Sequence, residues 1–325
     1  MKNIIVTGGS GFLGSHLLYK LTDEGYKPIA IKRKNSNLNN VKKIFSQNNQ
    51  ANLFHNINWV DGSLEDLSTI EKNFKKESTI FHCAGFVSFK KNEKNIIYET
   101  NYIGTKNLIN LCLKKSISSF CHVSSIAALS NIDNKITNET NWFTFSNKKS
   151  HYAISKYLGE MEVWRGFSEG LQGFIINPSL IIGPGDKNSL FGRMVPKIKK
   201  NTIFYPQGGT GFVDVRDVAN ILIQLAENNV NHQRYIINSE NLSFKELLFL
   251  FAKHTNGTEP KIKIHNNIIR LFIIINKLIN PYNKLNLNMI DFFKSNSKYS
   301  NQKIKSELNY KFITIKKSIN EIISI

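Results

Sequence analysis

The chain has 325 residues, of which 41% are hydrophobic and 21% charged, values typical of a globular protein with a large core. Its net charge of +19 is spread along the chain, which is rich in Lys, Asn and Ile and shows no known nucleic-acid-binding motif, so we expect no nucleic-acid partner. No apolar run is long enough to span a bilayer, Met1 leads too directly into the first strand to leave room for a signal peptide, and three cysteines without a CxxC pair favour a reducing cytoplasm.

The first half of the chain alternates short apolar runs with amphipathic stretches, which predicts a parallel sheet covered by helices on both faces. Strands are expected at 3–7, 28–32, 57–61, 79–83, 119–124 and 172–177. Helices are expected at 12–24, 38–48, 65–74, 93–115 and 151–168. Right-handed crossovers would make this an α/β fold with a doubly wound Rossmann sheet. The polar stretch 130–149 is expected to be a loop bordering the ligand site.

After Pro178, proline and glycine residues break the pattern into shorter pieces. Helices are expected at 190–200, 216–228, 243–255, 265–279 and 314–324, and strands at 211–215 and 233–238. We therefore predict two domains: a Rossmann domain over 1–178, and a smaller substrate-binding lobe over 179–325 with some elements returning to the first sheet.

A glycine-rich motif follows the first expected strand. Gly8 permits a tight turn, Gly11 lets a pyrophosphate approach the backbone, and Gly14 lets the helix pack closely on the sheet. The free N–H groups of the helix N-terminus attract phosphates. The residues of this predicted dinucleotide cradle are Thr7, Gly8, Gly11, Phe12, Leu13 and Gly14. A tight turn without a ligand is the alternative.

The end of the second strand distinguishes NAD from NADP. An NAD site has an acidic residue there for the ribose 2′-hydroxyl, but residues 26–60 contain no Asp or Glu. Lys32, Arg33 and Lys34 stand at this position instead, and Arg33 with a neighbouring lysine would bind a 2′-phosphate well. We expect NADP(H) as the preferred cofactor, with NAD(H) as the alternative; ordinary solvated cations would also explain the pattern.

Tyr152 and Lys156 lie four residues apart on an expected helix and so share one face. A free phenol has a pKa of about 10, which a nearby ammonium lowers. Lys156 can do this while binding the nicotinamide ribose, and Ser125 at a strand end can hold the substrate oxygen. Tyr152 would then exchange a proton with that oxygen while hydride moves to or from carbon. This pattern predicts hydride transfer on a carbonyl or secondary alcohol, although Tyr-x-x-x-Lys alone also occurs by chance.

Two His–Cys pairs, His82–Cys83 and Cys121–His122, end neighbouring expected strands and could suggest a metal site. Adjacent strand residues point to opposite faces of a sheet, and cysteines commonly fill cores. We therefore expect no metal.

These motifs together resemble the extended short-chain dehydrogenase/reductases, also called the NAD-dependent epimerase/dehydratase family. Further segments that carry the resemblance are 81–85, 101–105, 123–125, 177–179, 183–185 and 211–219. The catalytic residues that it implies are Ser125, Tyr152, Lys156 and Asn101, the last shaping the proton-relay side. It also implies that Ala84 and Gly85 line the adenosine side and that Pro178 and Ser179 line the nicotinamide.

The branch of the family is read from the residues after Ser125, which lack the Tyr-Gly of nucleotide-sugar epimerases and the acidic pair of dehydratases. The chain is more similar to the dihydroflavonol-reductase and 3β-hydroxysteroid-dehydrogenase branch. One departure is Gly62-Ser63-Leu64, where the family has Gly-Asp-Leu against adenine; Ser63 can still accept a hydrogen bond.

Together, the residues and the resemblance predict an NADPH-preferring reductase or dehydrogenase acting on a small, rather apolar carbonyl compound or its alcohol. The resemblance also implies a homodimer paired through helices 93–115 and 151–168. The alternatives are a nucleotide-sugar epimerase or dehydratase with tightly held NAD, and a non-catalytic cofactor sensor of the same fold.

Overall fold

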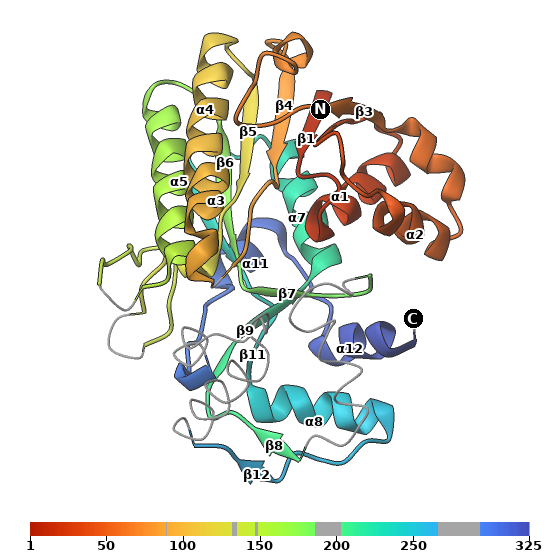
Figure 1. Ribbon diagram of the computed structural model, residues 1–325, viewed down its shortest axis with the longest axis vertical. Helices are drawn as coiled ribbons and strands as arrows, with labels where there is room; N and C mark the ends of the chain where they lie inside the picture. The colour runs from red at the N-terminus through yellow and green to blue at the C-terminus, as the bar shows by residue number, and fades with distance from the viewer. Residues whose placement is uncertain (89, 132–134, 147–148, 186–202, 266–292, 325) are drawn as a thin grey trace.

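The computed structural model describes residues 1–88, 90–131, 135–146, 149–185, 203–265 and 293–324, and every structural statement below concerns these residues. A parallel sheet with the strand order β10-β6-β5-β4-β1-β2-β3 forms the upper half of the molecule (Figure 1). Its strands are β1 (Lys2–Thr7), β2 (Ile29–Lys32), β3 (Asn58–Asp61), β4 (Ser78–His82), β5 (Ser119–Val123), β6 (Gly173–Pro178) and β10 (Gln233–Ile237). The expected α/β fold with a Rossmann-type sheet is confirmed.

Helices cover both faces of this sheet because its strands are apolar on both sides. On β1, Ile4 and Val6 belong to the core under α1 (Phe12–Asp23), α2 (Asn39–Gln47) and α7 (Val215–Glu227). Ile5 belongs to the opposite core, under α4 (Gly104–Lys114) and α5 (His151–Ser168). Figure 1 shows α3 (Lys94–Tyr98) beside α4 and α5 on this second face.

Two of the expected helices differ from the structure. Residues 65–74 form turns and the short 3₁₀ turn η2 (Glu71–Asn73), since Asp66 accepts hydrogen bonds from the Ser68 backbone and hydroxyl at 3.0 and 2.6 Å and so favours a local turn over a helix. The expected helix 93–115 is divided by the π-helical turn η4 (Glu99–Ile103) between α3 and α4. Short 3₁₀ turns also occur at η1 (Ala51–Asn56), η3 (Lys91–Glu93) and η5 (Ile126–Ala128).

A smaller mixed sheet lies below the first, with the order β11-β9-β7 (Figure 1). Its strands are β7 (Leu180–Ile182), β9 (Gly209–Asp214) and β11 (Glu240–Ser243), and β8 (Phe204–Tyr205) pairs separately with β12 (Ile262–Lys263). The remaining helices are α8 (Phe244–Thr255), α11 (Gln302–Leu308) and α12 (Ile315–Ser324). The sequence did not predict β7, β11 or α11, and the expected helices 190–200 and 265–279 lie outside the described residues. No helix in the described ranges is both long and apolar enough to cross a membrane.

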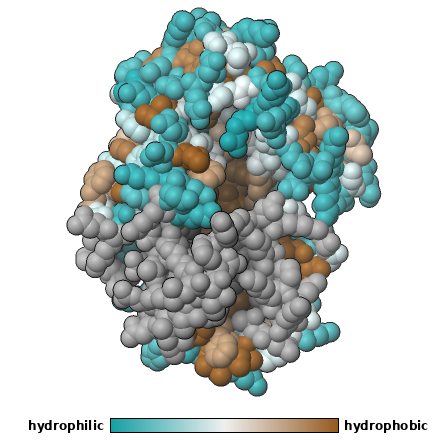
Figure 2. Space-filling model, viewed as in Figure 1, coloured by the Kyte–Doolittle hydropathy of each residue, from teal (hydrophilic) through white to brown (hydrophobic). Residues whose placement is uncertain are grey.

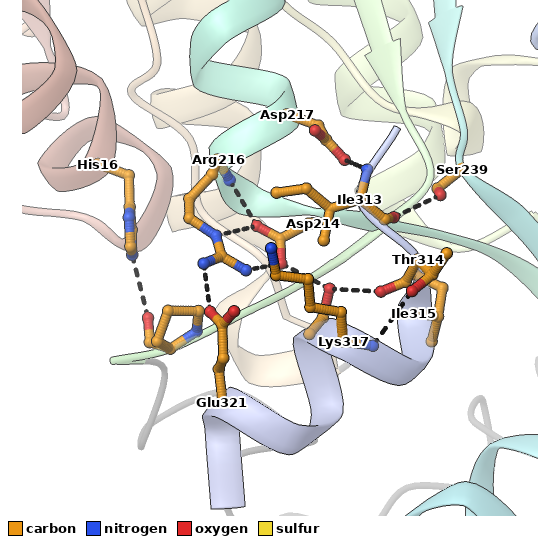
Figure 3. A network of polar contacts seen from close by, with 12 residues as sticks. His16, Asp214, Arg216, Asp217, Ser239, Ile313, Thr314, Ile315, Lys317 and Glu321 are labelled. Atoms are coloured by element: carbon orange, nitrogen blue, oxygen red, sulfur yellow. Dashed lines mark hydrogen bonds and ion pairs between the residues drawn. The ribbon is translucent and has the colours of Figure 1, made fainter. Parts of the chain in front are cut away.

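A polar network ties the C-terminal helix α12 to α7 (Figure 3). Asp214 is the N-cap of α7 and accepts hydrogen bonds from the Arg216 backbone and guanidinium, each at 2.8 Å. The same guanidinium forms an ion pair with Glu321 of α12. Asp217 accepts from the backbone N–H of Ile313 at 2.9 Å. These contacts hold the C-terminal segment against the end of β9, where the two sheets meet.

Candidate active site

The glycine-rich turn after β1 has the close backbone approaches that a dinucleotide cradle requires. Gly8 has a φ of +70°, and a Cβ atom there would lie 2.6 Å from the Ala84 nitrogen. A Cβ atom on Gly14 would lie 2.2 Å from the Gly8 oxygen. Gly11 is the N-cap of α1 and has no side chain to satisfy the first N–H groups of that helix, which begins at Phe12. The turn therefore fits a pyrophosphate at the helix N-terminus.

The three cations at the end of β2 have different surroundings. Lys32 forms an ion pair with Asp61, its register partner at the end of β3. Arg33 and Lys34 are exposed beyond it. The sequence analysis did not identify this pairing, because Asp61 becomes a neighbour of Lys32 only when β2 and β3 pair. Arg33 and Lys34 remain at this edge as groups that fit a 2′-phosphate.

The other expected cofactor residues lie after β3, β4 and β6. Ser63 accepts from the Glu65 backbone at 3.1 Å, and the Leu64 carbonyl accepts from Asn107 at 3.2 Å. Ala84 donates to the Thr7 hydroxyl at 3.3 Å. These bonds fix the loops after β3 and β4.

Pro178 ends β6, and the next residue, Ser179, is buried. Within the described part of the chain, the Ser179 hydroxyl has no hydrogen-bond partner. A buried, unsatisfied hydroxyl costs free energy unless a ligand satisfies it, so this position fits a polar group such as the nicotinamide carboxamide.

Ser125, Tyr152 and Lys156 come together at the carboxyl edge of β5. Ser125 is the second residue after this strand, and its side chain forms a hydrogen bond with that of Tyr152. Tyr152 lies in the first turn of α5, which is capped by Ser150 through a 3.1 Å bond from the Ala153 nitrogen. Lys156 lies one turn further on α5, and its Nζ donates to the Val123 carbonyl at 2.7 Å.

Burial favours the neutral forms of Tyr152 and Lys156 and so shifts the pKa values of both. It raises the pKa of Tyr152, and the hydrogen bond with Ser125 acts in the opposite direction. Burial lowers the pKa of Lys156 to about 8, against the opposing effect of the Glu160 carboxylate. In the protein without cofactor, Tyr152 is therefore a protonated phenol at neutral pH. Such a group can donate a proton.

Asn101 lies in the π-helical turn η4 and joins three segments of the site. Its Nδ2 donates to the Phe86 carbonyl at 2.9 Å and to the Ser155 hydroxyl at 3.0 Å, and its Oδ1 accepts from the Phe86 nitrogen at 2.8 Å. A Cβ atom on Gly85 would lie 3.5 Å from this Oδ1 and 3.9 Å from Lys156 Nζ. Asn101 thus fixes the loop after β4 against α5, and Gly85 lies between the expected cofactor side and Lys156.

His82 links the cradle to this π turn, a role that the sequence analysis did not identify. Its Nδ1 lies 2.7 Å from the Thr7 hydroxyl and its Nε2 lies 3.0 Å from the Thr105 hydroxyl. Because Thr105 donates to the Asn101 carbonyl, its oxygen must accept from His82, so the proton of His82 is on Nε2. Burial lowers the pKa of His82 to about 3, so the ring stays neutral. Among the described residues, no group of three or more His, Cys, Asp or Glu side chains is arranged to hold a metal.

Comparisons with known proteins identify the family of the chain and its fold. Residues 4–238 match the family model described as the NAD dependent epimerase/dehydratase family. Over 79% of its length the chain is 28% identical to a Synechocystis protein named putative dihydroflavonol 4-reductase, of which it covers 73%. It is 29% identical to anthocyanidin reductase of Arabidopsis thaliana, covering 90% of this chain and 95% of that protein. The structure of UDP-glucose 4-epimerase from Thermotoga maritima superposes with a TM-score of 0.77 at 20% identity, covering 99% of this chain and 97% of that one, which is a likeness of fold.

Proposed function

The chain belongs to the NAD-dependent epimerase/dehydratase family, and from this premise we propose that it uses NADPH in preference to NADH and acts on a small, rather apolar carbonyl compound or its alcohol. It is an NAD(P)-dependent oxidoreductase of the extended short-chain type, a reductase or dehydrogenase. The observation that carries the proposal is the meeting of Ser125, Tyr152 and Lys156 beside the glycine cradle.

The proposed mechanism assigns each of these residues one task. When bound, the nicotinamide supplies or accepts the hydride. Ser125 holds the substrate oxygen by a hydrogen bond from its hydroxyl. Tyr152 delivers a proton to that oxygen during reduction, for which its raised pKa keeps the phenol protonated. Lys156 binds the ribose and favours the phenolate that remains after the proton has left.

Three observations support NADPH and an apolar substrate. Lys32 is engaged by Asp61, whereas Arg33 and Lys34 remain exposed beside it. Relatives of the chain carry the names putative dihydroflavonol 4-reductase, anthocyanidin reductase and tetraketide alpha-pyrone reductase 1. Figure 2 shows hydrophobic residues deep in the hollow at the middle of one face, between the upper and lower halves of the molecule.

The test is oxidation of NADPH and NADH by the purified protein in the presence of aldehydes, ketosteroids, dihydroflavonols and a UDP-sugar ketone. Tyr152→Phe is the control: it should lower turnover by at least about 10²-fold, since proton transfer is lost, while cofactor binding stays unchanged. Full turnover in this variant would refute the assigned role of Tyr152. Absence of turnover in the native protein, with cofactor retained through purification, would favour an epimerase or a cofactor sensor instead.

We also propose a homodimer paired through the helices of the α3–α5 face. The cytoplasmic location stays a prediction, to which the structure adds that Cys83, Cys112 and Cys121 are free thiols.

A further inference from the structure

A buried acidic residue lies one helical turn after Lys156, on the same helix. Glu160 is completely buried, and its side-chain hydrogen-bond partners all donate to its carboxyl oxygens. Its Oε2 accepts from the Ser124 hydroxyl at 2.6 Å and from Asn177 Nδ2 at 2.8 Å. Its Oε1 accepts from the Arg234 guanidinium at 2.9 Å and from the Trp164 indole at 3.5 Å. The amide, guanidinium and indole groups can only donate here, so both carboxyl oxygens of Glu160 act as acceptors.

These contacts connect Glu160 to the main chain of the expected catalytic serine. Ser124 directly precedes Ser125, and Asn177 Nδ2 donates to the Ser125 carbonyl at 3.0 Å as well as to Glu160. Glu160 therefore holds the end of β5 through its own bond to Ser124 and through the shared amide of Asn177. A shift of this carboxylate would move the Ser125 hydroxyl relative to Tyr152.

Arg234 is the charged partner in direct contact with Glu160. It is 4% exposed and reaches Glu160 from β10, the edge strand of the sheet. Its guanidinium also donates to the carbonyls of Glu139 and Asn141 and lies 4.5 Å from the Trp142 ring centre. With Arg234 in place, Glu160 is neutralised by a direct partner, and the Lys156 ammonium stays directed to the Val123 carbonyl.

The other titratable groups that act on Lys156 are neutral. His82 on β4 and His122 on β5 are buried, and burial lowers the pKa of each far below neutrality. Cys83 follows β4, and burial raises the pKa of its thiol to about 12. Tyr152 is a protonated phenol, as argued above. Among the described residues, Glu160 is therefore the anion that stabilises the charged form of Lys156.

We propose that Glu160 is a positioning residue of this active site. Its carboxylate stabilises the ammonium form of Lys156 through space and fixes the Ser125 main chain. Arg234 occupies this carboxylate and so prevents a direct ion pair between Glu160 and Lys156. This inference rests on the proposed function, since that function gives Ser125 and Lys156 their roles. Glu160 touches neither substrate nor cofactor in this proposal and acts only through these neighbours.

The experiment compares Glu160→Gln with the native full-length protein, using two measurements. The first follows the ¹³C shift of the Lys156 Cε atom from pH 6 to 10, assigned by its loss in Lys156→Arg, and needs neither substrate nor cofactor. The native midpoint is expected near pH 8, and Glu160→Gln should lower it by about one pH unit, the size of effect that a nearby opposite charge has. The second measurement is the pH profile of turnover. Its alkaline limb should shift to lower pH by the same amount.

Matched variants separate a charge effect from a structural one. Glu162→Gln removes a carboxylate from the same helix, where Glu162 pairs with Arg165 at 2.9 Å, and should leave the Lys156 midpoint unchanged. Glu160→Asp keeps the charge, so its Lys156 midpoint should lie closer to the native value than that of Glu160→Gln. If Glu160→Gln does not fold because Arg234 is left buried without its partner, the double variant Glu160→Gln/Arg234→Met removes both charges and should shift the midpoint in the same direction.

An unchanged Lys156 midpoint in a folded Glu160→Gln or double variant would overturn the proposal, as would an equal shift in Glu162→Gln. If the native protein has no turnover with any carbonyl, the proposed function fails, but the Lys156 titration still decides the role of Glu160.

Discussion

At the scale of single residues, the cofactor preference depends on Arg33. Its neighbour Lys32 is paired with Asp61, so Arg33 is the first exposed cation after β2. A charged hydrogen bond to a 2′-phosphate contributes about 1.5–3 kcal/mol, so Arg33→Ser should raise the KM for NADPH roughly 10- to 100-fold. The KM for NADH, which has no 2′-phosphate, should change less than about twofold. Initial rates with each cofactor measure both.

The control for this change is Lys27→Ser. Lys27 is also an exposed cation, but it precedes β2 and so lies at the opposite edge of the sheet from the cofactor. It should leave both KM values unchanged. Equal losses for NADPH and NADH in Arg33→Ser would show that this residue does not read the 2′-phosphate.

At the scale of elements, Gly159 allows α5 to lie close to the π turn η4, because it has no side chain at the contact. A Cβ atom on Gly159 would lie 2.2 Å from the Asn101 carbonyl oxygen, which is backbone and cannot move aside alone. Gly159→Ala should therefore displace α5 and destabilise the protein by about 1–3 kcal/mol, the usual cost of overpacking. Because Lys156 and Tyr152 are on this helix, turnover should also fall. Denaturant unfolding and initial rates measure the two effects.

Gly166, also on α5, provides the comparison. A Cβ atom there would lie 2.9 Å from Cγ2 of the buried Ile109 side chain, a longer contact than the one at Gly159 and one with a side chain instead of the backbone. Alanine also favours a helix over glycine by about 1 kcal/mol, which offsets part of this contact, so Gly166→Ala should destabilise the protein less than Gly159→Ala. If both variants unfold at the same denaturant concentration, the contact between Gly159 and Asn101 does not constrain the helix.

The elements that the sequence predicted well are those with a strong local pattern. The strands of the first sheet are apolar runs, and α5 is preceded by Ser150, a good N-cap. The π turn around Asn101 was not predicted, because one extra residue in a turn hardly changes the apolar period of 93–115. The short strands β7 and β11 have too few residues to show alternation.

At the scale of the whole molecule, the polar contacts beneath the site could not be predicted because they join distant segments. Glu160 and Arg234 are 74 residues apart, and they meet only because β10 pairs with β6 at the edge of the first sheet. Lys32 and Asp61 likewise meet through strand pairing. The motifs could be predicted because their residues lie close together in the sequence. The polar contacts that support them form only when the strands of the sheet have paired.

The largest assembly that we expect is a homodimer formed through the α3–α5 face. These helices lie together on one side of the sheet in Figure 1, where Ile96 is 49% exposed and Ile154, Leu158 and Met161 are partly exposed. Two copies would bury these side chains against each other, so light scattering should give twice the 37.2 kDa mass of one chain.

Leu158→Asp should convert this dimer to a monomer, since it places an unpaired carboxylate on the proposed face. Phe249→Asp is the matched control: Phe249 is 40% exposed on α8 in the lower part of the molecule, and its replacement should leave the dimer intact. If the native protein is strictly monomeric across the micromolar range, the proposed pairing is wrong, and the exposed apolar side chains of this face are then ordinary surface residues.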